Sequence, residues 1–367
     1  GAGDEAEAFL QDQLQYAVKI LMNSFYGVFA SSFYRFTHPD LGASITEWAR
    51  HNIRGIISQV EEDGHEVVVL DNFVTGRHEN LAHHKDKVRL KVHQVDITEL
   101  KSIQPYFEGV EWVFHLAGLA GIVPSIVHPL NYYRTNVDGT VNVIECSRQA
   151  NVKRFIYVAS STCYGIPDKY PTPESADIRL HYPYALTKYI GEKCVIHWGE
   201  VYKIPVISLR LFNVYGIRSR TSGAYGAVFG VFFAQKIAHQ PFTIVGDGTQ
   251  TRDFTYITDV ISALITAAKS DVKTEIFNVG SGGTYSINRL VELLGGEVVH
   301  IPKRPGEPDC TLADIKKIKQ LLGWEPKVSF KRGVEIMLQN IDYWEEAPLW
   351  SPATILEATE DWFKYLT

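Results

Sequence analysis

The sequence predicts an α/β protein in which a doubly wound parallel sheet carries a smaller C-terminal lobe. From Gly64 onward, short apolar runs rich in Val, Ile and Phe alternate regularly with helical patterns along the 367-residue chain. These runs are continuously apolar rather than alternating with polar residues, which is typical of parallel strands covered by helices on both faces. After Gly216 the elements become shorter and more mixed, and this change predicts the smaller lobe.

The expected elements can be located along the chain. The expected strands are residues 65–72, 88–97, 111–118, 154–161 and 205–216, and the long helices expected between them are residues 131–150 and 184–202. Ligands of such sheets bind at the carboxyl ends of the strands, so the residues that end each strand are the first candidates for a site. The aromatic-rich tail, residues 340–366, is expected to add a helix that packs on the body.

Composition limits the class of protein. The chain is 45% hydrophobic and 21% charged, and its formal net charge is -6 without a long Lys/Arg run, so a nucleic-acid partner is not indicated. The start, GAGDEAEAFLQDQ, lacks the apolar core of a signal peptide, and no segment approaches the ~18 apolar residues of a membrane span. We therefore expect a cytoplasmic protein that is not bound to a membrane. No metal site or disulfide framework is expected, because the four cysteines lie far apart without a CxxC pair: Cys146, Cys163, Cys194 and Cys310.

An acidic residue ends the first expected strand of this series. In EEDGHEVVVLDNFVTG, Asp71 follows a β-branched run. An acid at this place, at the end of the second strand of a nucleotide-binding βαβ unit, typically holds the adenosine ribose. Asp96 ends the next strand in the same way, and both residues could instead simply form turns. A Gly-rich phosphate loop should stand about twenty residues upstream of Asp71. The upstream segment SITEWARHNIRGIISQV has one Gly, so the first βα unit is atypical.

A second group of residues has the spacing of acid–base chemistry. Tyr184 and Lys188 are four residues apart on one helix face, where the lysine charge is expected to lower the tyrosine pKa and make it a general base. Ser160 and Ser161 end a strand, where a hydroxyl could bind a sugar oxygen. The alternatives are an ordinary surface helix and an ordinary strand-to-loop turn. FHLAG, residues 114–118, ends a further strand in small residues, which suit either a cofactor or close helix–sheet packing.

Together these motifs resemble a known family. LDNF, VDI, FHLAG, TNVDGT, SST and YALTK, in this order, resemble the extended short-chain dehydrogenase/reductases, and most closely nucleotide-sugar epimerases of the UDP-glucose 4-epimerase type. RLFNVYG, GDGTQTRDFTYITDV, FNVGSG and KRPGEPD extend the resemblance, which covers residues 64–367. It implies a Rossmann-like NAD-binding domain over residues 64–216, and a substrate-binding lobe with C-terminal helices over residues 217–367. It also implies a homodimer formed through the two long helices.

The resemblance assigns roles to individual residues. It implies a catalytic triad of Ser160, Tyr184 and Lys188, in which Tyr184 takes the proton of a sugar hydroxyl while a hydride passes to NAD; the keto sugar then turns over and the hydride returns to its other face. The acid at position 71 favours NAD over NADP. The implied cofactor-binding residues are Asp71, Asn72, Asp96, Ile97, Leu116, Ala117, Gly118, Asn136, Tyr184, Lys188 and Phe212. The implied substrate-binding residues are Ser160, Asn213, Arg252, Arg304 and Glu307.

Two positions separate the sister reactions of the family. The 4,6-dehydratases carry Asp-Glu just after the catalytic hydroxyl, and UDP-glucuronate decarboxylases carry Glu at the second of these places. Ser161 and Thr162 stand there in this chain, and neither can act as a carboxylate acid or base, so the resemblance favours an epimerase. The small residues Cys310 and Thr311 suggest room for an N-acetyl group on the sugar.

The N-terminal segment departs from the family. On the family's register, Glu47, Arg50 and Ile53 stand where the three loop glycines should be, so charge and bulk are expected to impair NAD binding and activity. No first strand of the sheet is expected in this segment: QYAVKILMNSFYG suggests a helix that ends at a glycine. The first strand is therefore expected to be lost or makeshift.

Residues 10–68 have a resemblance of their own. KILMNSFYG and its surroundings are similar to the fingers-to-palm stretch of family B DNA polymerases, with Phe73 where the second metal-binding Asp would stand. We therefore predict a chimera in which a polymerase-like segment, residues 1–63, replaces the first βα unit. The alternatives are a divergent epimerase with an N-terminal extension, a remnant that binds UDP-sugar but not NAD, and a nucleic-acid-binding polymerase derivative.

Overall fold

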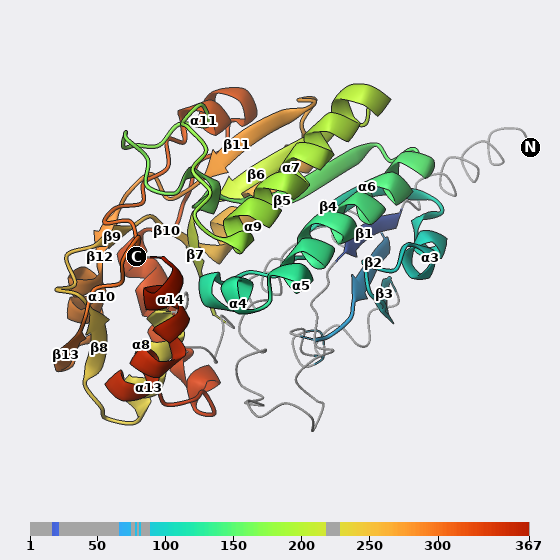
Figure 1. Ribbon diagram of the computed structural model, residues 1–367. Helices are drawn as coiled ribbons and strands as arrows, with labels where there is room; N and C mark the ends of the chain where they lie inside the picture. The colour runs from blue at the N-terminus through green and yellow to red at the C-terminus, as the bar shows by residue number, and fades with distance from the viewer. Residues whose placement is uncertain are drawn as a thin grey trace, which may run out of the picture.

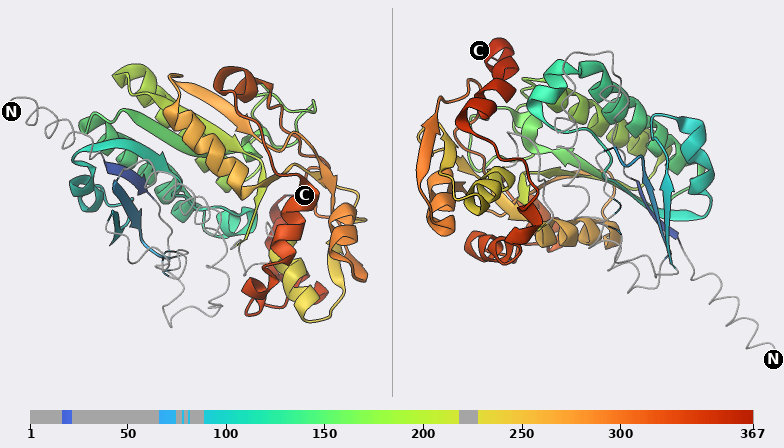
Figure 2. Two further views of the ribbon diagram at one scale, coloured as in Figure 1. Left: turned by 180° about the vertical axis from the view of Figure 1, so that it is seen from behind. Right: turned by 90° about the horizontal axis from the view of Figure 1, so that it is seen from below.

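The computed structural model describes the backbone of residues 17–21 and then residues 66–74, 78, 81, 89–217 and 228–366. Within these residues, seven strands form one sheet in the order β11-β6-β5-β4-β1-β2-β3 (Figure 1). Each neighbouring pair in it is parallel. Helices cover both faces of this sheet (Figure 2), with α6 and α7 on one face and α9 on the other. The predicted doubly wound α/β fold is therefore confirmed.

The central strand of the sheet comes from the N-terminal segment. β1, Ala17–Leu21, pairs with β2 on one side and with β4 on the other. The prediction of a helix over this stretch is wrong. Of the two outcomes expected for the first strand, loss or a makeshift replacement, the strand is not lost, because a strand from the N-terminal segment takes its place. The backbone N–H and C=O groups of β2 and β4 that face each other across this position would be buried without partners, so an apolar segment in extended conformation is stabilised there.

The other expected strands lie where the sequence places them. They are β2 (Glu66–Asp71), β3 (Leu90–Gln94), β4 (Val110–His115), β5 (Arg154–Ser160) and β6 (Val206–Leu211). The last expected segment also contains β7, Asn213–Tyr215, which leaves the main sheet and pairs with β10, Phe254–Tyr256. β11, Glu275–Val279, returns to the main sheet beside β6.

The helices of the sheet follow the sequence pattern with one local change. α7 is Pro183–Tyr202, as expected, whereas the expected helix 131–150 consists of α5 (Pro129–Tyr133), a π-helical stretch (Arg134–Gly139) and α6 (Thr140–Gln149). α4 (Ile122–Val127) precedes them, α3 (Leu100–Ile103) follows β3, and α9 (Ile257–Lys269) follows β10. A π-helical turn inside an α-helix often marks a functional position.

The C-terminal lobe is built from short elements, as predicted. β8 (Phe242–Val245) pairs with β13 (Val298–Ile301), and β9 (Thr251–Arg252) pairs with β12 (Tyr285–Ser286). Its helices are α8 (Val228–Ile237), α10 (Ile287–Leu294) and α12 (Phe330–Leu338), whereas α11 (Lys316–Leu322) packs beside β11 of the main sheet. The tail forms α13 (Pro352–Ala358) and α14 (Glu360–Tyr365), which pack on the body.

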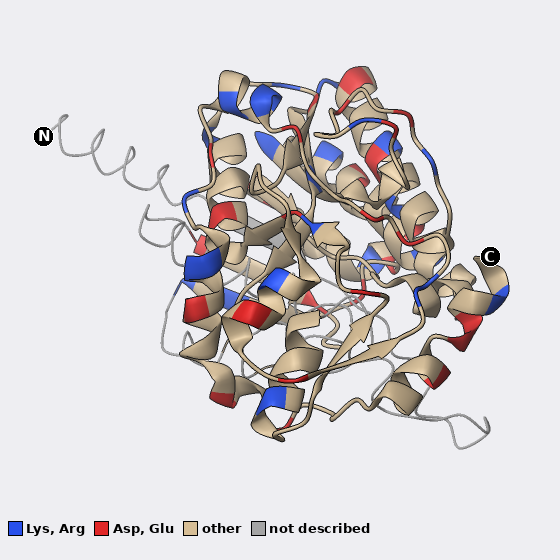
Figure 3. Cartoon of the chain, turned by 90° about the vertical axis from the view of Figure 1, so that its left-hand side faces the viewer, with Lys and Arg blue, Asp and Glu red and all other residues tan. Residues whose placement is uncertain are grey.

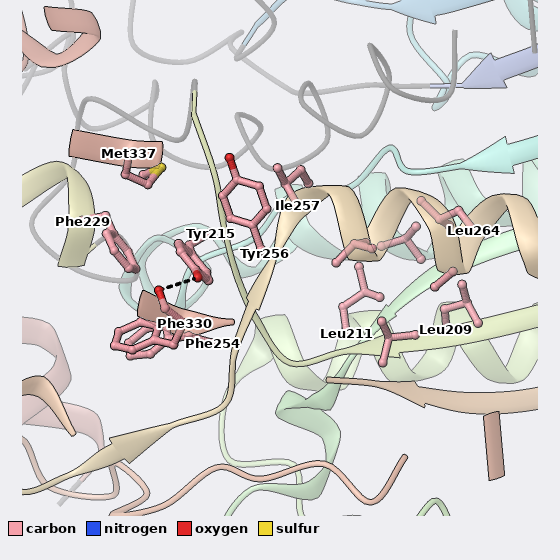
Figure 4. Close-up of a cluster of buried hydrophobic side chains, with 14 of the residues drawn as sticks. Leu209, Leu211, Tyr215, Phe229, Phe254, Tyr256, Ile257, Leu264, Phe330 and Met337 are labelled. Carbon is pink, nitrogen blue, oxygen red and sulfur yellow. Dashed lines mark hydrogen bonds between the residues drawn. The ribbon is translucent and has the colours of Figure 1, made fainter. Parts of the chain in front are cut away.

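One apolar cluster joins the lobe to the sheet (Figure 4). Leu209 and Leu211 of β6 belong to the same buried cluster as Tyr215, whose ring stacks on Phe229 with centroids 4.8 Å apart. The Tyr215 hydroxyl donates a hydrogen bond to the Phe330 carbonyl at 3.3 Å. Because burial of apolar surface is the main favourable contribution to folding, this shared cluster fixes the lobe against the carboxyl ends of the strands.

The position of β1 makes a prediction about stability. A proline at Ile20 removes one N–H from the centre of the sheet, and a buried carbonyl left without its donor costs about 1–3 kcal/mol. Ile20→Pro should therefore lower the free energy of unfolding in urea by at least this amount, whereas Ile20→Val should change it little. Equal stabilities of the two variants would show that β1 does not complete the sheet.

Candidate active site

The predicted site residues gather at one edge of the sheet. All strands of the sheet are parallel, so their carboxyl ends lie together. In the order β4-β1-β2, the strand order reverses beside β1, because the chain continues from β1 to β2 and β3 on one side and then returns to β4 on the other. Ligands bind at such a switch point in open α/β sheets. Asp71 ends β2, Gly118 follows β4, Ser160 ends β5 and Phe212 follows β6. The structure thus brings together residues that are far apart in the sequence.

The turns at the ends of β2 and β3 are linked through Asn72. Asp71 is 4% exposed, and its Oδ1 accepts a hydrogen bond from the Phe73 N–H at 2.7 Å. The Asn72 Nδ2 donates to Asp96 Oδ2 at 3.1 Å, and Asp96 Oδ1 accepts from the Thr98 N–H at 2.8 Å. Both aspartates therefore form turns, the alternative that the sequence left open, and these turns fix the orientation of carboxylates at the ligand edge.

Ile97 and Phe212 are buried beside these turns and strands. Ile97 is 0% exposed and packs against Gly139, where an added Cβ would lie 2.6 Å from Ile97 Cδ1. Phe212 is also buried, and its ring lies 6.3 Å from that of Tyr164, centroid to centroid. Their side chains pack the walls behind the ligand edge.

The segment after β4 is held by Asn136 of the π-helical stretch. Asn136 Oδ1 accepts from the Leu119 N–H at 2.7 Å, and Asn136 Nδ2 donates to the Leu119 carbonyl at 2.9 Å. A Cβ on Gly118 would lie 3.0 Å from Asn136 Oδ1 and 3.5 Å from Lys188 Nζ, so close packing already requires the small residue. Leu116 and Ala117 are buried in the clusters on the two sides of the sheet.

Ser160, Tyr184 and Lys188 lie together, as predicted. Ser160 Oγ accepts from the Thr162 N–H at 3.3 Å and from the Thr162 hydroxyl at 2.9 Å. Burial raises the pKa of Tyr184, and a side-chain hydrogen bond with Ser160 opposes this shift. The Tyr184 ring is half-buried between the rings of Tyr132 and Tyr182.

The expected effect of Lys188 on Tyr184 is wrong for this arrangement. The Lys188 ammonium lies 4.3 Å from the centroid of the Tyr157 ring, and its own burial lowers the pKa of Lys188 to about 7, against an opposing contribution from Glu192. A lysine that titrates near neutrality is only partly charged, and the burial of Tyr184 decides the direction of that residue's shift. The pair is therefore poised by desolvation more than by mutual attraction.

The sequence analysis missed a buried ion pair behind this helix. Glu192 accepts from Arg210 Nε at 3.0 Å and from the Ser208 hydroxyl at 2.8 Å, and the side chains of Glu192 and Arg210 are 2% and 4% exposed. Arg210 also donates to the Tyr164 hydroxyl at 2.9 Å, which donates to Asn278 Oδ1 at 2.7 Å. A Glu four residues after the lysine, on the same helix face, was the available signal.

The three charged members of the predicted substrate-binding set form a cluster in the C-terminal lobe; Figure 3 shows how Lys, Arg, Asp and Glu are distributed over the chain. Arg252 Nη2 lies 2.6 Å from Glu307 Oε1, and Arg304 Nη1 lies 3.8 Å from Glu307 Oε2. Arg252 and Arg304 are each 8% exposed. Two guanidinium groups share one carboxylate, so these three side chains carry a formal charge of +1, which suits the oxygens of a phosphate.

Tyr182 connects the two parts of the site. Burial raises the pKa of Tyr182, and Tyr184 and then Glu307 raise it further, so both groups lie within electrostatic range of one phenol. Beside the cluster, the Thr311 hydroxyl donates to Asn213 Oδ1 at 2.7 Å. The predicted proton-transfer residues and the predicted diphosphate-binding residues therefore border on the same side chain.

Other classes of site receive no support from the described part of the chain. No group of three or more His, Cys, Asp or Glu side chains there is placed to hold a metal ion. The four cysteines are free. Among the described residues, no helix combines the length and apolar character needed to cross a membrane. The positions expected for the loop glycines, Glu47, Arg50 and Ile53, lie outside the described residues.

The fold and this constellation define a nucleotide-dependent α/β enzyme, and comparisons with known proteins identify the family. The family model described as "NAD dependent epimerase/dehydratase family" matches residues 54–280, and the chain belongs to this family. Its matched region begins downstream of the positions where the glycine loop was expected.

Individual relatives show the range of reactions. A putative UDP-glucose 4-epimerase of Methanocaldococcus jannaschii is 32% identical over 287 residues, which cover 76% of this chain and 92% of that protein. UDP-glucuronic acid decarboxylase 4 of Arabidopsis thaliana is 29% identical over 78% of this chain, which spans only 65% of that protein. The solved UDP-N-acetylglucosamine 4-epimerase of Methanobrevibacter ruminantium M1, in complex with UDP-N-acetylmuramic acid, is 26% identical with a TM-score of 0.77, covering 89% of this chain and 98% of that one.

The lowered pKa of Lys188 predicts a pH dependence of stability. A lysine with a pKa of about 7 in the folded state and 10.5 in the unfolded state binds more protons when unfolded between these values, so its contribution to the free energy of unfolding rises with pH over this window. Lys188→Met removes this contribution. Between pH 7.5 and 9.5, wild-type stability measured in urea should rise relative to that of the variant by up to about 1.4 kcal/mol per pH unit.

A parallel pH dependence of the two proteins would contradict this assignment. The exposed Lys319, which lies in α11 beside β11, provides the control, because Lys319→Met should leave the wild-type slope unchanged.

Proposed function

We propose that this chain is an NAD-dependent UDP-hexose 4-epimerase that works by transient hydride transfer. The single observation that carries the proposal is the meeting of Ser160, Tyr184 and Lys188 at the carboxyl edge of the sheet, with Arg252 and Arg304 near by in the lobe. Residues 64–216 would form the NAD-binding domain, residues 217–367 the substrate-binding lobe with the C-terminal helices, and residues 1–63 the polymerase-like segment in place of the first βα unit.

The described residues fit the cofactor at the places where they can be tested. The carboxylate of Asp71 is held at the end of β2, where an adenosine ribose binds in this fold. Asn72, Asp96 and Ile97 would border the adenine, while Leu116, Ala117, Gly118, Asn136 and Phe212 would line the middle of the cofactor site. Bound NAD would supply a hydride acceptor that is regenerated in each cycle.

The chain's own residues would handle the proton. Because burial raises its pKa, Tyr184 would first have to lose its phenol proton. As the phenolate, Tyr184 Oη would accept the proton of the sugar 4-hydroxyl while the Ser160 hydroxyl, which is hydrogen-bonded to Tyr184, orients the reacting oxygen. Lys188, with its pKa near 7, would exchange protons close to neutral pH. Tyr184 would return the proton after the keto sugar has turned over, and Asn213, Arg252, Arg304 and Glu307 would hold the nucleotide diphosphate during that turn.

Decarboxylation or dehydration is the weaker assignment within the family. In the family members that this chain resembles, these reactions use a carboxylate directly after the catalytic hydroxyl. This chain has Ser161 and Thr162 at those positions. The Thr162 hydroxyl donates a hydrogen bond to Ser160 Oγ, so this side chain already positions the Ser160 hydroxyl. Cys310 and Thr311 support the hypothesis of an N-acetylated sugar, which fails if only UDP-glucose turns over.

A remnant that binds UDP-sugar without NAD is the second candidate. It is favoured by the charge and bulk of Glu47, Arg50 and Ile53 at the positions expected for the loop glycines. A nucleic-acid-binding polymerase derivative is the least favoured, since the chain is acidic and Phe73 replaces the second metal-binding acid. The four free cysteines support a reducing, cytoplasmic location.

Calorimetric titration with NAD and with UDP distinguishes these candidates, after bound nucleotide has been removed. Binding of both nucleotides with turnover of a UDP-hexose supports the epimerase, and binding of UDP alone supports the remnant.

Tyr184→Phe should lower kcat by about 10²–10⁴-fold, because it removes the group that exchanges the proton. Tyr202→Phe, at the exposed end of the same helix, should leave kcat unchanged. Full activity of Tyr184→Phe would overturn the assigned role.

Exposed apolar side chains on α5 and α7 support the homodimer. Leu130 is 70% exposed, Tyr133 47% and Leu186 42%, and grouped exposure of this kind is typical of an interface. Leu130→Glu combined with Leu186→Glu should convert a dimer to a monomer in analytical ultracentrifugation. Leu321→Glu alters an apolar side chain of α11 that is 52% exposed and should leave the mass unchanged. A wild-type monomer, or a dimer that survives the double change, would refute this interface.

A further inference from the structure

The C-terminal helix reaches the charged cluster of the substrate lobe. Trp362 of α14 is 4% exposed, and its indole Nε1 donates a hydrogen bond to the Pro305 carbonyl at 2.6 Å. The guanidinium carbon of Arg304 lies 5.5 Å from the centroid of the same indole ring. One side chain of the tail therefore contacts both the arginine that is proposed to bind the diphosphate and the turn that follows it.

Arg304 is held differently from its neighbour Arg252. Arg252 makes a 2.6 Å ion pair with Glu307, whereas Arg304 lies 3.8 Å from the other oxygen of that carboxylate, beyond hydrogen-bond distance. A guanidinium over the face of an indole is attracted by the negative face of the ring, and this contact is stronger when water is excluded. The indole of Trp362 is thus placed to fix the plane of the Arg304 guanidinium.

The turn after Arg304 has a second contact with α14. Gly306 has φ +67°, and a Cβ added there would lie 3.3 Å from the Leu366 carbonyl at the end of the helix. The turn is therefore bounded by Trp362 at Pro305 and by Leu366 at Gly306. On its other side α14 packs against α4, which belongs to the cofactor-binding part of the chain (Figure 1).

We infer that Trp362 is a positioning residue for the nucleotide sugar: the C-terminal helix, seated between α4 and the turn at Pro305, holds Arg304 in the orientation that binds the diphosphate. This inference rests on the proposed function, since it needs Arg304 as a ligand of the diphosphate. It gives the tail a role in binding that the family assignment does not contain.

Calorimetry on the full chain tests the inference with UDP and NAD as separate probes. Trp362→Leu removes both the ring face and the indole N–H and should weaken UDP binding about ten-fold while NAD binding changes less than two-fold. Trp362→Phe keeps a ring beneath Arg304 and should recover most of the UDP affinity. Tyr365→Leu, at an exposed position of the same helix, is the matched control and should bind UDP as the wild type does.

A double-mutant cycle with Arg304→Met separates positioning from support of the fold. If Trp362 acts through Arg304, its replacement should cause no further loss of UDP affinity in the Arg304→Met protein. Additive losses, or a Trp362→Leu protein that loses NAD and UDP equally, would overturn the inference and show a purely structural role. Wild-type UDP affinity in Trp362→Leu would overturn the inference alone. A wild type that binds no UDP would overturn the proposed function, and the inference with it.

Discussion

The sheet is continuous because β1 pairs with β2 and with β4. Without these two ladders, β2 and β3 would have no backbone connection to the other four strands, β4, β5, β6 and β11, and Asp71 would lose its place at the common edge. Parallel strands bury both faces and depend on their neighbours for every internal backbone hydrogen bond. The pairing therefore positions the cofactor side of the site as well as the core.

A second constraint fixes the catalytic side. Glu192 on α7 and Arg210 on β6 are both almost fully buried, so each is tolerable only with the other in place. Glu192 is also the charge that opposes the loss of the Lys188 proton. The Glu192–Arg210 pair thus links the register of α7 on the sheet to the electrostatics of Lys188. Because Tyr184 lies on the same helix, its position near the end of β5 also depends on this ion pair.

Much of the fold and the composition of the site followed from the sequence. Apolar runs gave β2 to β6, because buried parallel strands leave that local pattern, and parallel pairing then brings Asp71, Ser160 and the Tyr184 helix to one edge. β1 was missed because its five residues resemble part of a helix, and only the gap between β2 and β4 selects the extended form. The Glu192–Arg210 ion pair was missed because a contact between a helix residue and a strand residue leaves no periodic pattern in the sequence. The predicted direction of the Tyr184 pKa shift was wrong because burial, which a sequence does not display, raises this pKa more than the hydrogen bond with Ser160 lowers it.

The two ligand-binding halves depend on different parts of the chain. The proposed diphosphate cluster is built from β9 and the turn around Pro305, and the tail contacts this turn. The cofactor half depends in addition on the N-terminal segment that supplies β1 and carries Glu47, Arg50 and Ile53. In the proposed chimera the proposed nucleotide-sugar site can be retained while the affinity for NAD changes, because no contact of the arginine cluster given above involves residues 1–63. Backbone pairing needs only an extended conformation and so tolerates many sequences in β1, whereas a phosphate loop needs glycine at defined positions. Because the two requirements differ, one segment can complete the sheet and still, as proposed above, weaken the binding of NAD.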